Sequence, residues 1–201
     1  MPSFFVLYLP NRVWQSYCDT MKILCRPDTQ SPAHITVRGP YGTRPDVDQE
    51  WRKVSNIHIR VLDVGTFFED AQNTVFLRCE SPELASVWWK KHYRSMNPHI
   101  TIYDGDSREF AERVLGVLRR HKWRFSFVAD HLHEYVSNGR QMGLDLTWSD
   151  YGDVIRRVHG ASMGRNQLQA LSDNDRLELL AKVAEAFRSR IDETATAVGN
   201  P

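Results

Sequence analysis

Two short segments of the chain carry a histidine and a threonine in the same arrangement. The first is Pro32-Ala33-His34-Ile35-Thr36-Val37, and the second is Asn97-Pro98-His99-Ile100-Thr101-Ile102. Because side chains of a β-strand alternate between its two faces, the histidine and threonine of each H-x-T motif point to the same side. If the two strands lie together, one histidine can take a proton, the other can give one, and the hydroxyls can bind phosphate oxygens. The motifs therefore predict acid/base chemistry on a phosphodiester.

Three further side chains are candidates to contact a substrate. Arg38 follows Thr36 on the same face and could hold a phosphate or a nucleotide edge, or be a solvated charge. Tyr103 has the matching position after Thr101, where it could stack on a base or fill the wall of the cleft. Tyr41 belongs to a stretch rich in Gly and Pro, residues 39–45, which is expected to form a loop beside the first motif.

The composition is that of a folded protein. The chain has 201 residues, of which 41% are hydrophobic and 25% charged, enough for one sizeable domain or two small lobes. The formal net charge of +1 argues against strong electrostatic binding to duplex DNA. A small nucleotide or a single-stranded RNA end remains open as a partner.

The cysteines and the apolar segments predict a cytoplasmic protein. There are three cysteines and no C-x-x-C pair, so neither a disulfide framework nor a cysteine zinc site is expected. The apolar start lacks a basic region and meets Pro10 early, so it is interpreted as a first strand. No apolar run approaches the roughly 18 residues of a membrane span, and we expect no membrane association.

The order of elements before each motif is repeated. Residues 4–9 are rich in β-forming side chains, and Asn11 then caps a segment with helical spacing before the first motif. Residues 74–79 are again β-rich, and Ser81 precedes a second expected helix before the second motif. This order predicts an α+β fold built from a diverged strand-helix-strand duplication, with a pseudo-twofold cleft.

The pattern changes after the second motif. A helix capped at Ser107 or Asp106 and a strand over 123–128 are expected to complete a domain of residues 1–129. Residues 130–201 have helical periodicity and form an expected C-terminal helical extension, with one helix opened by Ser172. The sequence identifies no protein partner for this extension, which could contact another protein or fold over the cleft.

Residues 3–129 resemble the 2H phosphoesterase superfamily, which includes bacterial 2′-5′ RNA ligase-like proteins and 2′,3′-cyclic phosphodiesterases. The resemblance rests on the paired H-x-T motifs, the opening Phe-Phe-Val-Leu-Tyr-Leu-Pro and the Gly-Thr-Phe-Phe segment at 65–68. It implies a bilobal fold with the cleft between the lobes, and a mechanism without metal. His34 and His99 match the catalytic histidines of the family, and Thr36 and Thr101 match its phosphate-binding hydroxyls.

The expected function is hydrolysis of a cyclic or 2′-5′-linked nucleotide or RNA phosphodiester. One alternative is the reverse reaction, RNA end joining without ATP, and another is a module that binds or senses a nucleotide without turnover. No G-x-x-x-x-G-K loop occurs, so no nucleotide cofactor is expected. His131 and His133 could suggest a metal, but without a third ligand at a recognisable spacing no metal site is expected.

Overall fold

A computed structural model describes residues 3–29, 31–41, 55–68, 72–88, 95–136 and 151–198. Within these ranges the chain is a mixed α+β protein with seven strands, five α-helices and one 3-10 helix. In chain order the elements are β1 (Ser3–Leu7), α1 (Arg12–Cys25), β2 (Ile35–Tyr41), β3 (Ile57–Phe67), β4 (Thr74–Glu80), η1 (Pro82–Ser86), β5 (His99–Asp104), α3 (Arg108–Leu118), β6 (Phe125–Ala129), β7 (His133–Val136), α4 (Tyr151–His159), α5 (Arg165–Ala170) and α6 (Asp173–Val198).

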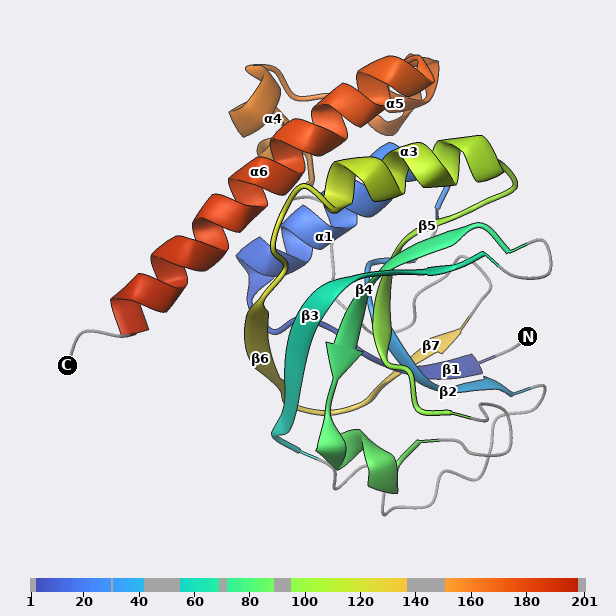
Figure 1. The fold of residues 1–201 in the computed structure, drawn as a ribbon, viewed down its shortest axis with the longest axis vertical. Helices are drawn as coiled ribbons and strands as arrows, with labels where there is room; N and C mark the ends of the chain where they lie inside the picture. Colours follow the sequence, from blue (N-terminus) through green and yellow to red (C-terminus); the bar gives the residue numbers. More distant parts are fainter. Residues whose placement is uncertain are drawn as a thin grey trace.

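The strands form one curled antiparallel sheet in the order β6-β3-β4-β5-β2-β1-β7 (Figure 1). Strands β5 and β2, which carry the two H-x-T motifs, are neighbours in this sheet. The helices α1 and α3 lie above the sheet in Figure 1, and α6 packs against both. The two motifs are therefore brought together by direct strand pairing.

The apolar side chains of β2 and β5 face the helices. Ile35 and Val37 of β2 and Ile100 and Ile102 of β5 are fully buried in the main core. They alternate with the half-buried residues of the H-x-T motifs, as a strand with one core face and one wetter face requires. The histidines thus lie on the side of the sheet that faces away from α1.

Helix α1 begins where the sequence predicts. The side chain of Asn11 accepts hydrogen bonds from the backbone N–H groups of Val13, at 3.0 Å, and Trp14, at 3.3 Å. These bonds satisfy donors that the first turn of a helix leaves without an intrahelical partner. The helix ends at Cys25, two residues before Pro27. The segment that leads toward the first motif therefore begins at Arg26.

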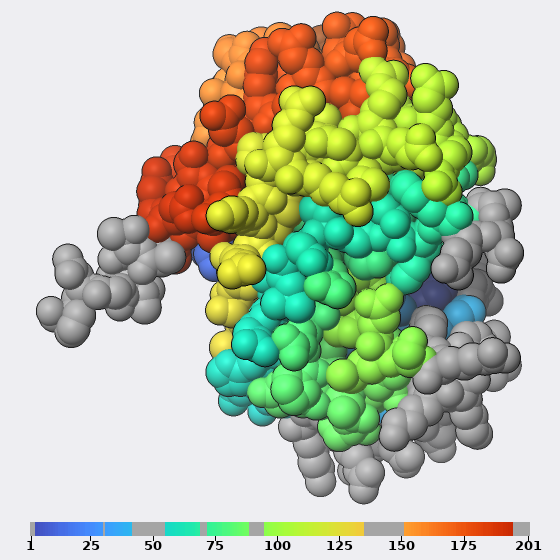
Figure 2. All heavy atoms as spheres, in the orientation of Figure 1, coloured from blue at the N-terminus to red at the C-terminus, as the bar shows by residue number. Residues whose placement is uncertain are grey.

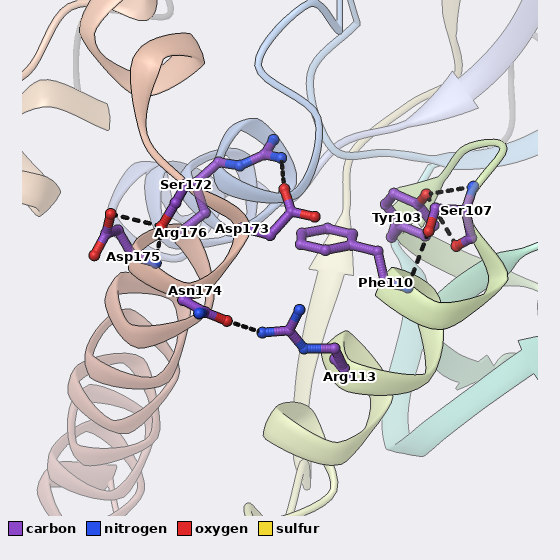
Figure 3. Close-up of polar contacts among 9 residues, drawn as sticks. All are labelled: Tyr103, Ser107, Phe110, Arg113, Ser172, Asp173, Asn174, Asp175 and Arg176. Atoms are coloured by element: carbon purple, nitrogen blue, oxygen red, sulfur yellow. Dashed lines mark hydrogen bonds and ion pairs between the residues drawn. The ribbon is translucent and has the colours of Figure 1, made fainter.

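The C-terminal helices pack on the helix layer, away from the H-x-T face. Phe187 of α6 stacks on Tyr17 of α1 with ring centroids 5.2 Å apart. Arg176 of α6 lies over the ring of Phe110 in α3, 5.1 Å from its centroid, and Arg113 of α3 hydrogen-bonds Asn174 (Figure 3). Figure 2 shows α3 and α6 side by side at the surface. The described helices of the extension therefore do not cover the H-x-T face of the sheet.

Two elements differ from the sequence prediction. The extension expected to be helical from residue 130 begins with β7, which pairs with β1 at the edge of the sheet. One buried core also includes side chains from both sides of residue 129, among them Phe125 and Phe187. The helix expected after Ser81 is the short 3-10 helix η1, and residues 89–94 lie outside the described part. No helix in the described ranges is long and apolar enough to cross a bilayer.

Candidate active site

Four side chains of the two H-x-T motifs share one face of the sheet. Ile35 and Ile100 are paired residues of β2 and β5. Because the strands are antiparallel, this register places His34 across from Thr101, and Thr36 across from His99. All four side chains are half-buried. The two imidazoles therefore lie diagonally across the strand pair, each opposite a hydroxyl of the other motif.

Both histidine rings are held in the same way. Nδ1 of His34 lies 2.7 Å from the carbonyl oxygen of Pro32, and Nδ1 of His99 lies 2.7 Å from that of Asn97. A carbonyl oxygen only accepts, so Nδ1 of each ring carries the hydrogen and donates it. In the neutral ring this leaves the lone pair on Nε2. The basic nitrogen of each neutral ring, which can take a proton, is therefore Nε2.

Aromatic rings from neighbouring strands surround the histidines. His99 contacts Phe76 of β4 and Phe67 of β3, with ring centroids 4.7 Å and 5.1 Å away, and Tyr8 lies 6.1 Å from His34. Gly65 makes the first contact feasible, because a Cβ at that position would overlap the Phe76 ring. These rings withdraw the imidazoles from water and restrict how they can turn.

This environment favours the neutral form of both histidines. Burial lowers the pKa of His34 to about 3, and the charges of Lys22 and His99 act in the same direction, opposed by the hydrogen bond to Pro32. Burial also lowers the pKa of His99, but there the bond to Asn97 and the charge of Asp104 oppose the shift. The two rings therefore have similar geometry and different electrostatic surroundings.

A polar stripe on α1, formed by Gln15, Asp19 and Lys22, holds the backbone that leads into His34. Gln15 Nε2 donates to the Ala33 carbonyl at 2.8 Å, and its Oε1 accepts from Leu9 N at 2.9 Å. Oδ1 of Asp19 accepts from Ala33 N at 2.6 Å. Lys22 Nζ donates to Ser31 Oγ at 2.9 Å and to the Pro32 carbonyl at 3.3 Å.

Sequence reasoning missed this stripe, although a signal was present. The three polar residues are spaced by four and then three positions, which places them on one face of a helix. All three are buried. Polar groups are rarely buried without hydrogen bonds, so the stripe requires a backbone segment as its partner.

Of the three expected substrate contacts, only Arg38 lies on the H-x-T face. It is half-buried, and its Nε donates to the carbonyl of Val87 just after η1. This bond joins β2 to the segment that follows β4. Tyr41 ends β2 as part of the strand rather than a loop, roughly 20 Å along it from His34. Its ring meets Phe5 edge-on at 5.9 Å, so it does not join the histidines.

Tyr103 is turned to the opposite side of the sheet from the histidines. The pairing of β4 with β5 shifts by one residue, from Phe76 with Thr101 to Val75 with Tyr103. Such an irregularity reverses the face on which later side chains lie. Tyr103 is buried in the core, and its hydroxyl accepts from Ser107 N at 3.2 Å and lies 3.3 Å from the Ser107 carbonyl (Figure 3). The prediction that it lines the cleft is wrong.

A third histidine lies close to the site. His133, the first residue of β7, is half-buried and its ring lies 5.1 Å from that of Tyr8, which also contacts His34. The ring of His131 is 4.1 Å from that of His133. Burial lowers the pKa of His133 to about 4, and the charge of His131 lowers it as well. Within the described ranges, no group of three or more His, Cys, Asp or Glu is placed to hold a metal ion.

Comparison with known proteins adds no assignment to this geometry. No protein-family model and no curated protein sequence matches the chain. The function is therefore inferred from the residues and contacts described above.

Proposed function

We propose that this protein is a phosphoesterase that hydrolyses a cyclic or 2′-5′-linked nucleotide phosphodiester without a metal, using His34 and His99 as general base and general acid. The observation that carries the proposal is the paired geometry of the H-x-T motifs. Two imidazoles lie on one face of adjacent strands, and each is anchored through Nδ1, so that Nε2 is the basic nitrogen of the neutral ring. A base and an acid on either side of a phosphate are what hydrolysis of a phosphodiester needs.

The chemistry assigns a task to each of the four side chains. One Nε2 takes a proton from water as its oxygen bonds to phosphorus, and the other Nε2–H gives a proton to the departing ribose oxygen. The hydroxyls of Thr36 and Thr101, each across from a histidine in this register, donate hydrogen bonds to the phosphate oxygens in this scheme. Each proton transfer contributes on the order of 10²- to 10⁴-fold to the rate.

The arrangement of the sheet supports the resemblance to the 2H phosphoesterases. The H-x-T strands β2 and β5 are adjacent, and each is flanked by further antiparallel strands, β1 and β7 on one side and β4 and β3 on the other. A duplicated, bilobal fold with its cleft between the lobes would have this order around the motifs. On this reading, cyclic phosphates, RNA ends and 2′-5′ linkages are the substrate classes to test.

The test is turnover in EDTA against 2′,3′-cyclic nucleotides, cyclic dinucleotides, and 2′-5′ and 3′-5′ oligoadenylates. The variants are His34→Asn and His99→Asn, because the asparagine amide nitrogen lies near the position of Nδ1 and preserves the donor to the backbone carbonyl. His58→Asn, at an exposed position of β3, is the control. We expect turnover that survives chelation, falls at least about 100-fold in each site variant and is unchanged in the control.

Other outcomes would contradict the proposal in distinct ways. Activity that needs a metal, or that persists in both site variants, would rule out the two-histidine mechanism. Joining of an RNA 2′,3′-cyclic phosphate end to a 5′-hydroxyl end in the same assay would favour ligation. Tight nucleotide binding without turnover, unaffected by either substitution, would favour a binding module.

A further inference from the structure

The two histidines have different charged groups behind them. The carbonyl oxygen of Pro32, which accepts from Nδ1 of His34, also accepts from Nζ of Lys22 at 3.3 Å. A carbonyl oxygen has two lone pairs and can serve both donors. The charged group that acts on His99 is instead the carboxylate of Asp104, at the end of the same strand. The site is therefore symmetric in its rings and asymmetric in its charges.

Lys22 is an unusual residue to find in the interior of this domain. It is 9% exposed and lies on the face of α1 that holds residues 31–33. Burial lowers its pKa to about 8, while Asp19 and Asp104 favour its charged form and Arg26 opposes it. It is therefore charged at neutral pH and below. Burying an ammonium group costs free energy, so hydrogen bonds to Ser31 and Pro32 are needed to hold it there.

We propose that Lys22 is a positioning residue that assigns the two roles: its charge, acting through the shared Pro32 carbonyl, keeps His34 unprotonated as the general base and leaves His99 as the general acid. The inference rests on the proposed function and goes further by naming the direction of proton transfer. Lys22 itself does not touch the substrate in this scheme.

The step balances in the following way. Nε2 of His34 takes a proton from water as the water oxygen forms a bond to phosphorus. The bond from phosphorus to the ribose oxygen breaks, and Nε2 of His99 gives that oxygen its proton. Solvent then returns a proton to His99 and removes one from His34, so no other reactant is consumed.

The groups that face each ring favour this direction. His34 lies diagonally across the strand pair from His99 and beside the Tyr8 ring, and the charge of Lys22 acts on it from behind the Pro32 carbonyl. The charge of Lys22 opposes protonation of His34, and so does the charge that His99 carries when it is protonated. His99 is packed against aromatic rings of β3 and β4, and Asp104 favours its protonation. The charge of Lys22 lowers the pKa of His34 in addition to the effect of burial, and it is not among the causes of the shift in His99. The negative charge of a substrate phosphate placed between the rings would then favour uptake of a solvent proton by His99 before His34.

The closing experiment measures the pKa of each histidine by NMR and the pH dependence of turnover in the same proteins. Lys22→Gln removes the charge and keeps a hydrogen-bond donor, and Lys22→Met keeps the length of the buried stem if the first variant folds poorly. Lys122→Gln, at an exposed position after α3, controls for the loss of one positive charge. Signals are assigned by their absence in His34→Asn and His99→Asn.

We expect the Lys22 variants to raise the pKa of His34 by about 1 unit and to shift His99 much less, because a cation that close disfavours a second positive charge. The acid limb of kcat/KM should move to higher pH by the same amount, while the alkaline limb stays in place. Lys22→Arg keeps the positive charge, so the pKa of His34 and the acid limb of kcat/KM should stay at their values in the unmodified protein. A purely structural role for Lys22 would reduce stability or kcat without moving one limb selectively.

Several results would overturn the inference. One is a pKa of His34 that does not change in the Lys22 variants, and another is a pKa shift of equal size in both histidines. A third is movement of the alkaline limb of kcat/KM in place of the acid limb. The titration needs no turnover, so it decides whether Lys22 controls His34 even if no substrate is cleaved. Absence of turnover in all of these proteins would count against the proposed function. A pKa of His34 that is the same with and without Lys22 would count against the role of Lys22.

Discussion

The withdrawal of His34 from water has a consequence for stability that can be measured without a substrate. In the unfolded chain an imidazole takes its proton near pH 6.5, whereas burial in the folded protein lowers the pKa of His34 to about 3. Between these values the unfolded state binds more protons than the folded state. The contribution of His34 to stability is therefore fully present above pH 6.5 and is lost as the pH falls toward 3.

The size of the effect follows from the shift. Below pH 6.5, each pH unit removes about 1.4 kcal/mol from the free energy of unfolding. Lowering the pH from 7 to 5 should therefore cost about 2 kcal/mol through His34 alone. Domains of this size are stable by only about 5–15 kcal/mol, so this loss is readily measured. His99, whose pKa burial also lowers, adds to the loss in the same direction.

The assay is urea unfolding at pH 7 and pH 5 of the unmodified protein, His34→Asn and His58→Asn. Asparagine keeps a donor to the Pro32 carbonyl but cannot be protonated, so it removes the linkage and preserves the local bond. His34→Asn should lose about 2 kcal/mol less than the unmodified protein on acidification. The exposed control should behave like the unmodified protein. Equal losses in the unmodified protein and His34→Asn would refute the reasoning.

Contacts around the site should also affect the stability and the pH dependence of the protein. Gly65→Ala should destabilise the protein by about 1–3 kcal/mol in urea unfolding and reduce turnover, because the new Cβ overlaps the Phe76 ring that packs on His99; unchanged stability would contradict that packing. Tyr103→Phe should cost about 1 kcal/mol of stability through the lost Ser107 bonds and leave kcat/KM unchanged. A large loss of activity would show that Tyr103 does contribute to the site. The pH profile of kcat/KM should fall above a pKa lower than 6.5, because the burial of His99 lowers the pKa of the proposed acid; activity that stays level to pH 8 would exclude that role.

The sequence predicts which face of its strand each H-x-T side chain occupies, because this depends only on the alternation of side chains along a strand. Alternation along a strand puts His34 with Thr36, and His99 with Thr101, and the structure confirms this by burying Ile35 and Ile100 on the other face. That the two strands are direct neighbours is known from the sheet topology. The repeated order of elements predicts a duplicated fold with a cleft, and gives neither this strand pairing nor its register.

Tyr103 shows where the same property fails. Its position two residues after Thr101 predicts the cleft face, but the one-residue shift against β4 turns it into the core. An irregularity of this kind depends on how two strands pair, and nothing in the local sequence around Tyr103 marks it. The edge strand β7 was missed for a related reason. It is four residues long and is defined by pairing with β1 rather than by a β-rich run of its own.

Helix α1 connects the site with the C-terminal helices. Lys22 and Tyr17 are five residues apart, so they lie roughly 140° apart around the helix axis. Lys22 holds the segment before His34, while Tyr17 stacks on the fully buried Phe187 of α6. A helix fixed on two sides cannot turn or slide without breaking one set of contacts. The position of His34 therefore depends on α6, although the resemblance in sequence stops before that helix begins.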